Sequence, residues 1–341
     1  MYYAVPFLIS FSSSLVFTFI VKKIALANNI TDKPTAKRKI HKKPVPLLGG
    51  VSLFISFFVS AGVLFFLGYF TRGDIPPALI LSLFIGALII IVGGVIDDAV
   101  SLPPKFQIIF PIVSILPLLI AGVRVIFVTN PFGGVIEVNS LFSVVITFGW
   151  LLGMMYTTKL LDGLDGLLTG VGFIGSLIIF IVSLFWNQPF SSTSVLSIIF
   201  SGILLGFLFF NFHPAKIFLG EGGSLFVGYM LGLLSIISGS KIATTLLIMG
   251  LPIIDVFWVI FRRFQSNISI TTSGTDHFHF QLLKRGMSHR TAVVFLYSIA
   301  LFFGMLSLFL KTPGKIIALF LLLITAIFLL FWYYPKNREK Q

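Results

Sequence analysis

The run Ala78-Leu-Ile-Leu-Ser-Leu-Phe-Ile-Gly-Ala-Leu-Ile-Ile-Ile-Val-Gly-Gly-Val-Ile96 carries no charge, and Asp97-Asp98 follow it directly. A helix needs about 20 apolar residues to cross the hydrocarbon core of a bilayer. This stretch therefore predicts a transmembrane helix that ends in two carboxylates. Ionisable groups are costly at a membrane edge, so such a pair indicates a function.

Composition extends this reading to the whole chain. Of its 341 residues 57% are hydrophobic and 10% are charged, whereas soluble domains carry roughly a quarter charged residues. The absence of cysteine excludes disulfides, thiolate zinc sites and cysteine nucleophiles. The net charge of +13 is explained by basic loops on the cytoplasmic side, so we expect no nucleic-acid partner. We expect one all-α polytopic membrane domain over residues 1–341.

Apolar runs recur along the chain and predict about 11 transmembrane helices. They are roughly Tyr3–Leu26, Leu48–Tyr69, Ala78–Ile96, Ile108–Val123, Leu141–Leu161, Leu167–Trp186, Val195–Phe212, Ser224–Ile237, Ala243–Phe261, Ala292–Leu310 and Lys315–Tyr333. Two β-rich stretches flank a Pro/Gly turn between the fourth and fifth runs. They predict a small external β-hairpin near residues 124–138.

Lysine and arginine predict the orientation. With the N-terminus outside and the C-terminus in the cytoplasm, 19 of the 24 basic residues lie on the inner side and 5 on the outer side. We therefore expect a multi-pass protein of the plasma (inner) membrane. Nine of the eleven acids and all five histidines fall on the same inner side, which the basic-residue rule does not explain. A polar active site facing the cytoplasm does.

Two acidic motifs are candidate catalytic sites. Asp97 and Asp98 can hold a divalent cation or accept a proton, and the helix break before Lys105 can direct a cation toward them. Asp162-Gly-Leu-Asp165-Gly places two carboxylates three residues apart, on one helix face. The alternative interpretations are a solvated helix end for the first motif and a helix-ending turn for the second.

Three further motifs suit phosphate. Gly220-Glu221-Gly222-Gly223-Ser224 comes just before a helix, and a helix N-terminus binds anions. His277 and His279 could bind a metal or, as N–H donors, a phosphate, and without cysteine we favour phosphate. A basic amphipathic helix is the alternative there.

The loop of residues 32–50 carries the third motif, which includes Arg38, Lys39 and His41. Clustered cations beside the inner leaflet attract anionic lipid headgroups, although a topology signal alone is the alternative. Together the motifs predict a transferase acting on phosphate groups, with one apolar substrate in the bilayer and one charged substrate in the cytosol.

These motifs together resemble the polyprenyl-phosphate N-acetylhexosamine-1-phosphate transferases (glycosyltransferase family 4), closest to the undecaprenyl-phosphate GlcNAc-1-phosphate transferase branch. The resemblance runs from Asp32 to about Arg290 in the family's motif order. It rests on Asp32-x-Pro, Arg38-Lys39-x-His41, Pro44-x-Pro46, Gly49-Gly50, Asp97-Asp98, Leu102-x-Pro-Lys105, Asp162-Gly-Leu-Asp165-Gly-Leu, Pro214-Ala-Lys-Ile-Phe, Gly223-Ser224, Pro252, Asp255 and Asp276-His277-Phe-His279.

The resemblance implies a reaction and a cofactor. A UDP-N-acetylhexosamine, most often UDP-GlcNAc, would react with undecaprenyl phosphate to give the lipid-linked diphosphate sugar and UMP, the first membrane step of a cell-envelope glycan. Mg²⁺, or alternatively Mn²⁺, would bridge the diphosphate.

The resemblance also suggests roles for single residues. We expect Asp98 and Glu221 to bind the metal, with Asp162 near it, Asp97 to hold the lipid phosphate and Asp165 to lie by the nucleoside. Phosphate would be neutralised by Lys105, Lys159, His277 and His279, with Gly222 and Ser224 at the helix N-terminus. Arg38, Lys39 and His41 would guide the lipid headgroup, beside anionic inner-leaflet lipids.

Three positions depart from the family pattern. Lys159 stands where the family usually has Asn, Glu221 stands where it has Asp, and one imidazole is missing because Phe280 follows His279. If residues 159 and 221 meet, they would form a partly buried ion pair, with the metal shifted toward Asp97 and Asp98. An ordinary metal site in which Glu221 replaces Asp, and an inactive paralogue, are the alternatives.

Several readings stay open at this stage. Another amino sugar or a MurNAc-pentapeptide donor, a covalent phospho-aspartate intermediate and a homodimer all fit the sequence. A transporter of an anionic substrate is the alternative from another class. Transporters, however, bind substrate near the membrane midplane between repeated halves, whereas here the acids lie at helix ends and no repeat is evident.

Overall fold

The computed structural model describes residues 2–34, 43–70, 76–130, 134–186, 191–239, 241–267, 269 and 274–333. Its helices are α1 (Ala4–Ala27), α2 (Gly49–Phe66), α3 (Pro77–Val100), α4 (Pro104–Gln107), α5 (Ile109–Ile120), α6 (Ser140–Leu161), α7 (Leu167–Trp186), α8 (Ser192–Asn211), α9 (Gly220–Ile237), α10 (Ile242–Gln265), α11 (Phe278–Lys284), α12 (His289–Phe309) and α13 (Thr312–Tyr333). Two short antiparallel pairs join β1 (Thr31–Asp32) to β2 (Val45–Pro46) and β3 (Phe127–Thr129) to β4 (Val135–Glu137). The predicted all-α membrane architecture is confirmed.

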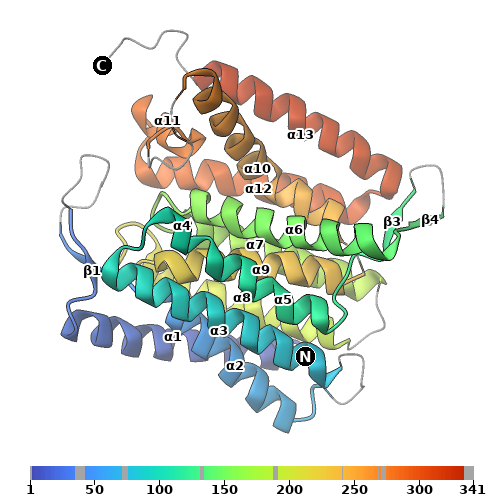
Figure 1. The fold of residues 1–341 in the computed structure, drawn as a ribbon, viewed down its shortest axis with the longest axis horizontal. Coiled ribbons are helices and arrows are strands. Elements are labelled where there is room, and N and C mark those ends of the chain that lie inside the picture. Colours follow the sequence, from blue (N-terminus) through green and yellow to red (C-terminus); the bar gives the residue numbers. More distant parts are fainter. Residues whose placement is uncertain are drawn as a thin grey trace.

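Ten of the described helices are long and apolar enough to cross a membrane. The run predicted at Ile108–Val123 is the exception, because it forms part of a shorter apolar segment, Pro104–Ile120. This segment still carries the chain from the end of the bundle near α4 to the end near the β3–β4 hairpin (Figure 1). The eighth predicted run begins earlier than the sequence suggested, at Gly220.

Helix α9 is the core of the bundle. Of its apolar window 83% is buried, against 28% for α1 and 22% for α13. It packs on α2, α3, α6, α7, α8 and α10. Glycines allow this close packing, since a Cβ on Gly222 or Gly223 would meet the backbone of Gly94 on α3 or of Gly50 on α2. The first turn of α9, which contains Glu221, is therefore fixed against two helices, α2 and α3.

The outer helices bury small polar residues and expose large apolar ones. On α1 the buried face carries Ser10, Ser14 and Thr18, while Leu8 and Phe19 are exposed. Ser14 Oγ donates a hydrogen bond of 2.7 Å to the carbonyl of Ile203 on α8. Small residues at helix contacts and large apolar ones on the outside are typical of helices surrounded by lipid. The chain is a multi-pass membrane protein.

The two ends of the bundle differ. Figure 1 shows β1, α4 and α11 near one end and the β3–β4 hairpin at the other. The hairpin predicted near residues 124–138 is confirmed, with Val128 opposite Ile136. The charged motifs lie at the end that carries β1, α4 and α11.

Candidate active site

Backbone hydrogen bonds join the first loop to the segment that precedes α9. The amides of Gly49 and Gly50 donate to the carbonyls of Phe218 and Leu219, at 3.0 and 2.8 Å, and the amide of Phe218 donates to the carbonyl of Pro46 at 2.9 Å. The glycines of the first loop therefore lie directly beside the Gly-Glu-Gly-Gly-Ser motif. Arg38, Lys39 and His41, which the sequence analysis placed in this loop, lie outside the described residues.

Asp98 and Glu221 meet where α3 ends and α9 begins. The amide of Glu221 donates to Asp98 Oδ1 at 3.1 Å. Gly220 has φ +72°, and a Cβ at this position would collide with the Asp98 carboxylate. The turn thus needs glycine for two reasons, the left-handed backbone and the close approach of a carboxylate.

Lys159 on α6 forms an ion pair with Glu221, as the sequence comparison of the two unusual positions suggested. Both side chains are largely buried, with 22% and 18% of their surface exposed. Lys159 Nζ also donates to Gln107 Oε1 at 3.0 Å. Gln107 Nε2 in turn donates to Asp97 Oδ1 at 3.0 Å and to the carbonyl of Leu102 at 2.9 Å.

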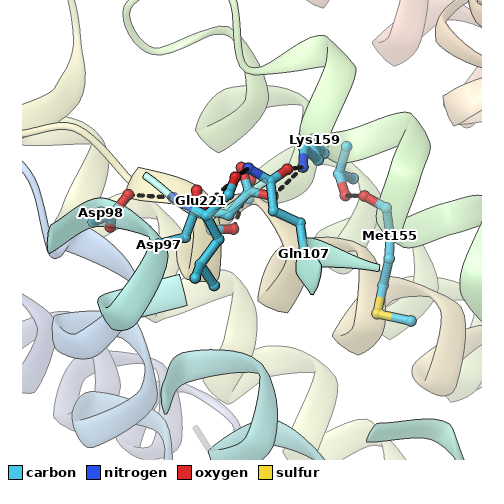
Figure 2. A network of polar contacts seen from close by, with 9 residues as sticks. Asp97, Asp98, Gln107, Met155, Lys159 and Glu221 are labelled. Carbon is cyan, nitrogen blue, oxygen red and sulfur yellow. Dashed lines mark hydrogen bonds and ion pairs between the residues drawn. The ribbon is translucent and has the colours of Figure 1, made fainter. Parts of the chain in front are cut away.

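Figure 2 shows this network running from Lys159 through Gln107 to Asp97, with Glu221 beside it. It joins three membrane helices, α3, α6 and α9, through the short helix α4. The sequence analysis missed Gln107, because a single glutamine two residues after Lys105 carries no pattern of its own. Lys105 itself is exposed on α4, with its ammonium 5.1 Å from the centre of the Phe106 ring.

Asp162 follows the last turn of α6 and adds a further carboxylate. Its amide donates to the carbonyl of Thr158 at 3.1 Å. Burial and, to a smaller extent, the negative charges of Glu221, Asp165 and Asp98 raise the pKa of Asp162 to about 8. Four acids from three separate motifs are thus close enough to repel one another.

Asp165, the second acid of the same motif, has different partners. Its Oδ2 lies 2.7 Å from His213 Nδ1 and accepts a hydrogen bond of 3.1 Å from the amide of Ala215. The His213 ring stacks on the ring of His289, with centroids 4.0 Å apart. His213 and His289 were not among the predicted site residues, although both belong to the five histidines that the sequence places on the inner side.

Asn211 connects the Asp165 turn to the loop that leads to α9. Its side-chain oxygen accepts from the amide of Gly166 at 3.2 Å and from Thr169 Oγ1 at 2.7 Å. Its side-chain amide donates to the carbonyl of Ile217 at 3.0 Å. One buried amide therefore fixes two motifs relative to each other.

The segment 274–279, called the histidine loop, is held against α10 through Asp255. His277 Nδ1 lies 2.9 Å from Asp255 Oδ2, and the amide of Phe278 donates to Asp255 Oδ1 at 2.9 Å. His279 is 2% exposed and packs over Gly163, where a Cβ would collide with its ring. Burial and, to a smaller extent, the neighbouring His277 and His289 lower the pKa of His279 to about 3. His279 is therefore neutral near pH 7.

The Gly222–Ser224 segment is less open than the sequence suggested. Gly222 is buried against Gly94, and Ser224, 2% exposed, donates its hydroxyl to the carbonyl of Glu221 at 2.9 Å. Close helix packing accounts for these small residues. Phosphate binding by Gly222 and Ser224 stays a prediction.

The donor set fits a hard divalent cation. Mg²⁺ prefers carboxylate oxygens, and Asp98 and Asp162 supply them beside Glu221, which is paired with Lys159. Asp165, His213 and His289 form a second group whose ligand atoms lie within 4.8 Å of one another. Their imidazoles are stacked 16° from parallel, so one ion could not lie in both ring planes, and this group fits a metal poorly.

Comparison with known proteins finds similarity along nearly the whole chain. The sequence profile of glycosyl transferase family 4 matches residues 80–239, which include Asp97, Asp98, Lys159, Asp162, Asp165 and Glu221. A probable undecaprenyl-phosphate N-acetylglucosaminyl 1-phosphate transferase of Bacillus subtilis (strain 168) is 33% identical over 331 residues, covering 95% of this chain and 89% of that protein.

Two further relatives extend the comparison. A decaprenyl-phosphate N-acetylglucosaminephosphotransferase of Mycolicibacterium smegmatis is 31% identical and covers 76% of this chain and 70% of its own. A phospho-N-acetylmuramoyl-pentapeptide-transferase of Halalkalibacterium halodurans is 28% identical and covers 89% of this chain and 95% of its own. The names of these relatives include two acceptors, undecaprenyl phosphate and decaprenyl phosphate. They also include two sugar classes, N-acetylglucosamine and N-acetylmuramoyl-pentapeptide.

Proposed function

The chain belongs to glycosyl transferase family 4, and we propose that it transfers N-acetylglucosamine 1-phosphate from UDP-N-acetylglucosamine to undecaprenyl phosphate, releasing UMP. It is a phosphoglycosyl transferase that acts on a polyprenyl phosphate. The choice of N-acetylglucosamine follows the names of several relatives, one of which is the Bacillus subtilis protein that matches 95% of this chain. The MurNAc-pentapeptide donor is the alternative named by a more distant relative.

The observation that carries the proposal is the convergence of carboxylates with a fixed ammonium at one end of the bundle. Asp97, Asp98 and Glu221 come from two membrane helices, and Lys159 from a third. Phosphoryl transfer needs mainly positioning and charge stabilisation. A site that binds one phosphate on a lipid and two on a nucleotide requires such a mixture of acids and cations at a helix end.

In the proposed reaction an oxygen of the lipid phosphate attacks the β-phosphorus of the UDP-sugar. One P–O bond forms, the bond from that phosphorus to the bridging oxygen breaks, and UMP leaves with the electron pair. Asp97, held by Gln107 and the amide of Leu102, would orient the lipid phosphate. Lys159 would contact the diphosphate, and Asp165 would lie by the nucleoside.

A bound Mg²⁺ would neutralise charge on the diphosphate, and Asp98 and Asp162 are the residues that would hold it. Glu221 was expected as a ligand, but its carboxylate already faces an ammonium. His277 and His279 would border the site from the histidine loop, with His279 neutral. A buried neutral imidazole offers one N–H donor to phosphate without adding a charge.

We place the site on the cytoplasmic side of the plasma membrane, because UDP-sugars are cytosolic and the basic residues favour that side. Anionic inner-leaflet lipids would lie beside the basic first loop. This placement concerns orientation only, and the transfer reaction does not depend on it.

A transfer assay with purified protein in detergent tests the proposal. UDP-GlcNAc, UDP-GalNAc and UDP-MurNAc-pentapeptide are each supplied with undecaprenyl phosphate, and UMP and lipid-linked product are measured. We expect UMP and lipid product in equal amounts with UDP-GlcNAc, and none without the lipid. UMP with only another donor would replace the sugar assignment, and no UMP with any donor would overturn the function.

A further inference from the structure

Glu221 is engaged on two sides. Its carboxylate is paired with Lys159, and its backbone amide donates to Asp98. A metal ligand needs an oxygen lone pair directed at the ion. The adjacent ammonium occupies Oε1 of Glu221 and repels a cation that approaches either oxygen of this carboxylate. Glu221, which its position would make a metal ligand, is thus already paired with a competing cation, the Lys159 ammonium.

Lys159 is held as firmly as its partner. Gln107 Oε1 accepts a second hydrogen bond from Nζ at 3.0 Å, and Gln107 is itself fixed by Asp97 and the carbonyl of Leu102. Moving the ammonium away from Glu221 would leave a largely buried carboxylate unpaired, since only 18% of its side-chain surface is exposed. The pair is therefore a fixed part of the site rather than a chance contact of a flexible lysine.

An ammonium has three N–H donors, and these two contacts use two of them. The third remains for an anion that enters the carboxylate cluster. Two partners also determine where the nitrogen lies, so that an incoming phosphate would meet a cation already in position.

We propose that Lys159 is a permanent counter-charge that removes Glu221 from the metal-ligand set, so that the divalent cation is held by Asp98 and Asp162 with reduced affinity, and Glu221 acts as the positioning residue for Lys159. The inference rests on the proposed function only in treating this cluster as the diphosphate site. It assigns Lys159 part of the positive charge that a divalent ion would otherwise supply.

Metal binding to the substrate-free protein tests this directly. The full-length protein in detergent is titrated with Mn²⁺, and free Mn²⁺ is measured by its electron paramagnetic resonance signal. Lys159→Asn releases Glu221 and removes a repelling charge, so we expect Mn²⁺ affinity to rise about tenfold, which corresponds to about 1.4 kcal/mol. A rise below threefold would overturn the proposal.

A charge-neutral double variant separates a ligand from a positioning residue. Lys159→Met with Glu221→Gln removes both charges and leaves the net charge of the site unchanged. We expect its Mn²⁺ affinity to stay within threefold of the original protein, because Glu221 supplies no ligand. A fall of threefold or more would identify Glu221 as a ligand and refute the proposal. Thermal unfolding of each variant shows whether it is folded.

Lys216→Asn is the matched control. Lys216 is exposed and lies five residues before Glu221 in the chain. The substitution therefore removes one positive charge without changing the Lys159–Glu221 pair. We expect less than a twofold change, because exposed charges are screened; a rise equal to that of Lys159→Asn would mean that net charge alone sets the affinity, and would sink the proposal. The titration uses no substrate, so failure of the transfer assay and failure of this inference are separate results.

Discussion

Two halves of the site hold their carboxylates with different partners. In the lysine-paired half (Asp97, Asp98, Gln107, Lys159 and Glu221), an ammonium balances Glu221. In the histidine-paired half (Asp165, His213, Asp255, His277 and His279), imidazoles face Asp165 and Asp255.

The difference separates two tasks. In the lysine-paired half, carboxylates from two membrane helices lie around one ammonium, an arrangement suited to binding phosphate. The histidine-paired half mainly fixes loops, because Asp165 and Asp255 also accept backbone amides.

The largest expected effect comes from Asp98→Asn in the lysine-paired half. The variant keeps the shape of the side chain and the acceptor for the Glu221 amide, but it removes the negative charge that would hold the cation. We expect UMP release to fall by at least about 1000-fold, with little change in the temperature of unfolding. Activity within tenfold of the original would mean that the lysine-paired half is not the catalytic half.

A smaller effect is expected from Asp165→Asn in the histidine-paired half. The amide is a weaker acceptor for His213 and for the Ala215 amide, so the loop before α9 should loosen. We expect kcat/KM to fall by about 10- to 100-fold, mostly through KM for the UDP-sugar. Steady-state kinetics with varied UDP-GlcNAc measures this.

Asp276→Asn is the control for that experiment. Asp276 pairs with Arg263 at 2.9 Å on the same end of the bundle, and its side chain is 39% exposed. We expect less than a threefold change in kcat/KM. Equal losses in the two variants would show that any acid on this end matters, and the distinction between the halves would fail.

The free energy of unfolding of the Lys159→Met variant tests the ion pair of the lysine-paired half. The change leaves Glu221 largely buried without its cation, which should cost about 2 kcal/mol, between the values for exposed and buried pairs. Glu221→Gln added to it should restore most of the loss. The free energy of unfolding in detergent is measured for the single variants and the double variant, and purely additive costs would argue against the pair.

The smallest effect concerns pH and His279. Its folded-state pKa of about 3 lies below the usual value of 6.5, so the unfolded chain takes up a proton first as the pH falls. The contribution to stability is intact above about pH 6.5 and is lost progressively between pH 6.5 and 3. At pH 5.5 the loss is about 1.4 kcal/mol. His279→Gln should flatten this acid slope in thermal unfolding, and an unchanged slope would show that another group causes it.

Much of the site could be predicted from local patterns. Residues only a few positions apart indicate a functional site in three places: Asp97-Asp98, Asp162-Gly-Leu-Asp165 and the histidine loop. The Lys159–Glu221 pair was a hypothesis that rested on the family resemblance, because both residues depart from the family pattern. Gln107 could not be predicted, because its importance depends on lying between Asp97 and Lys159 (Figure 2).

The sequence by itself determined that this protein is a bundle of membrane helices and predicted nine of its eleven acids and all five histidines on one side. Hydrophobic length suffices for this, since a helix in a bilayer satisfies its backbone hydrogen bonds within its own segment. Only the tertiary structure decided which partner each charge has. Lys159, Gln107 and Glu221 come from α6, α4 and α9, and their contacts depend on how closely glycines let α3 and α9 approach. Packing between distant segments, which no local pattern records, placed Lys159 beside Glu221.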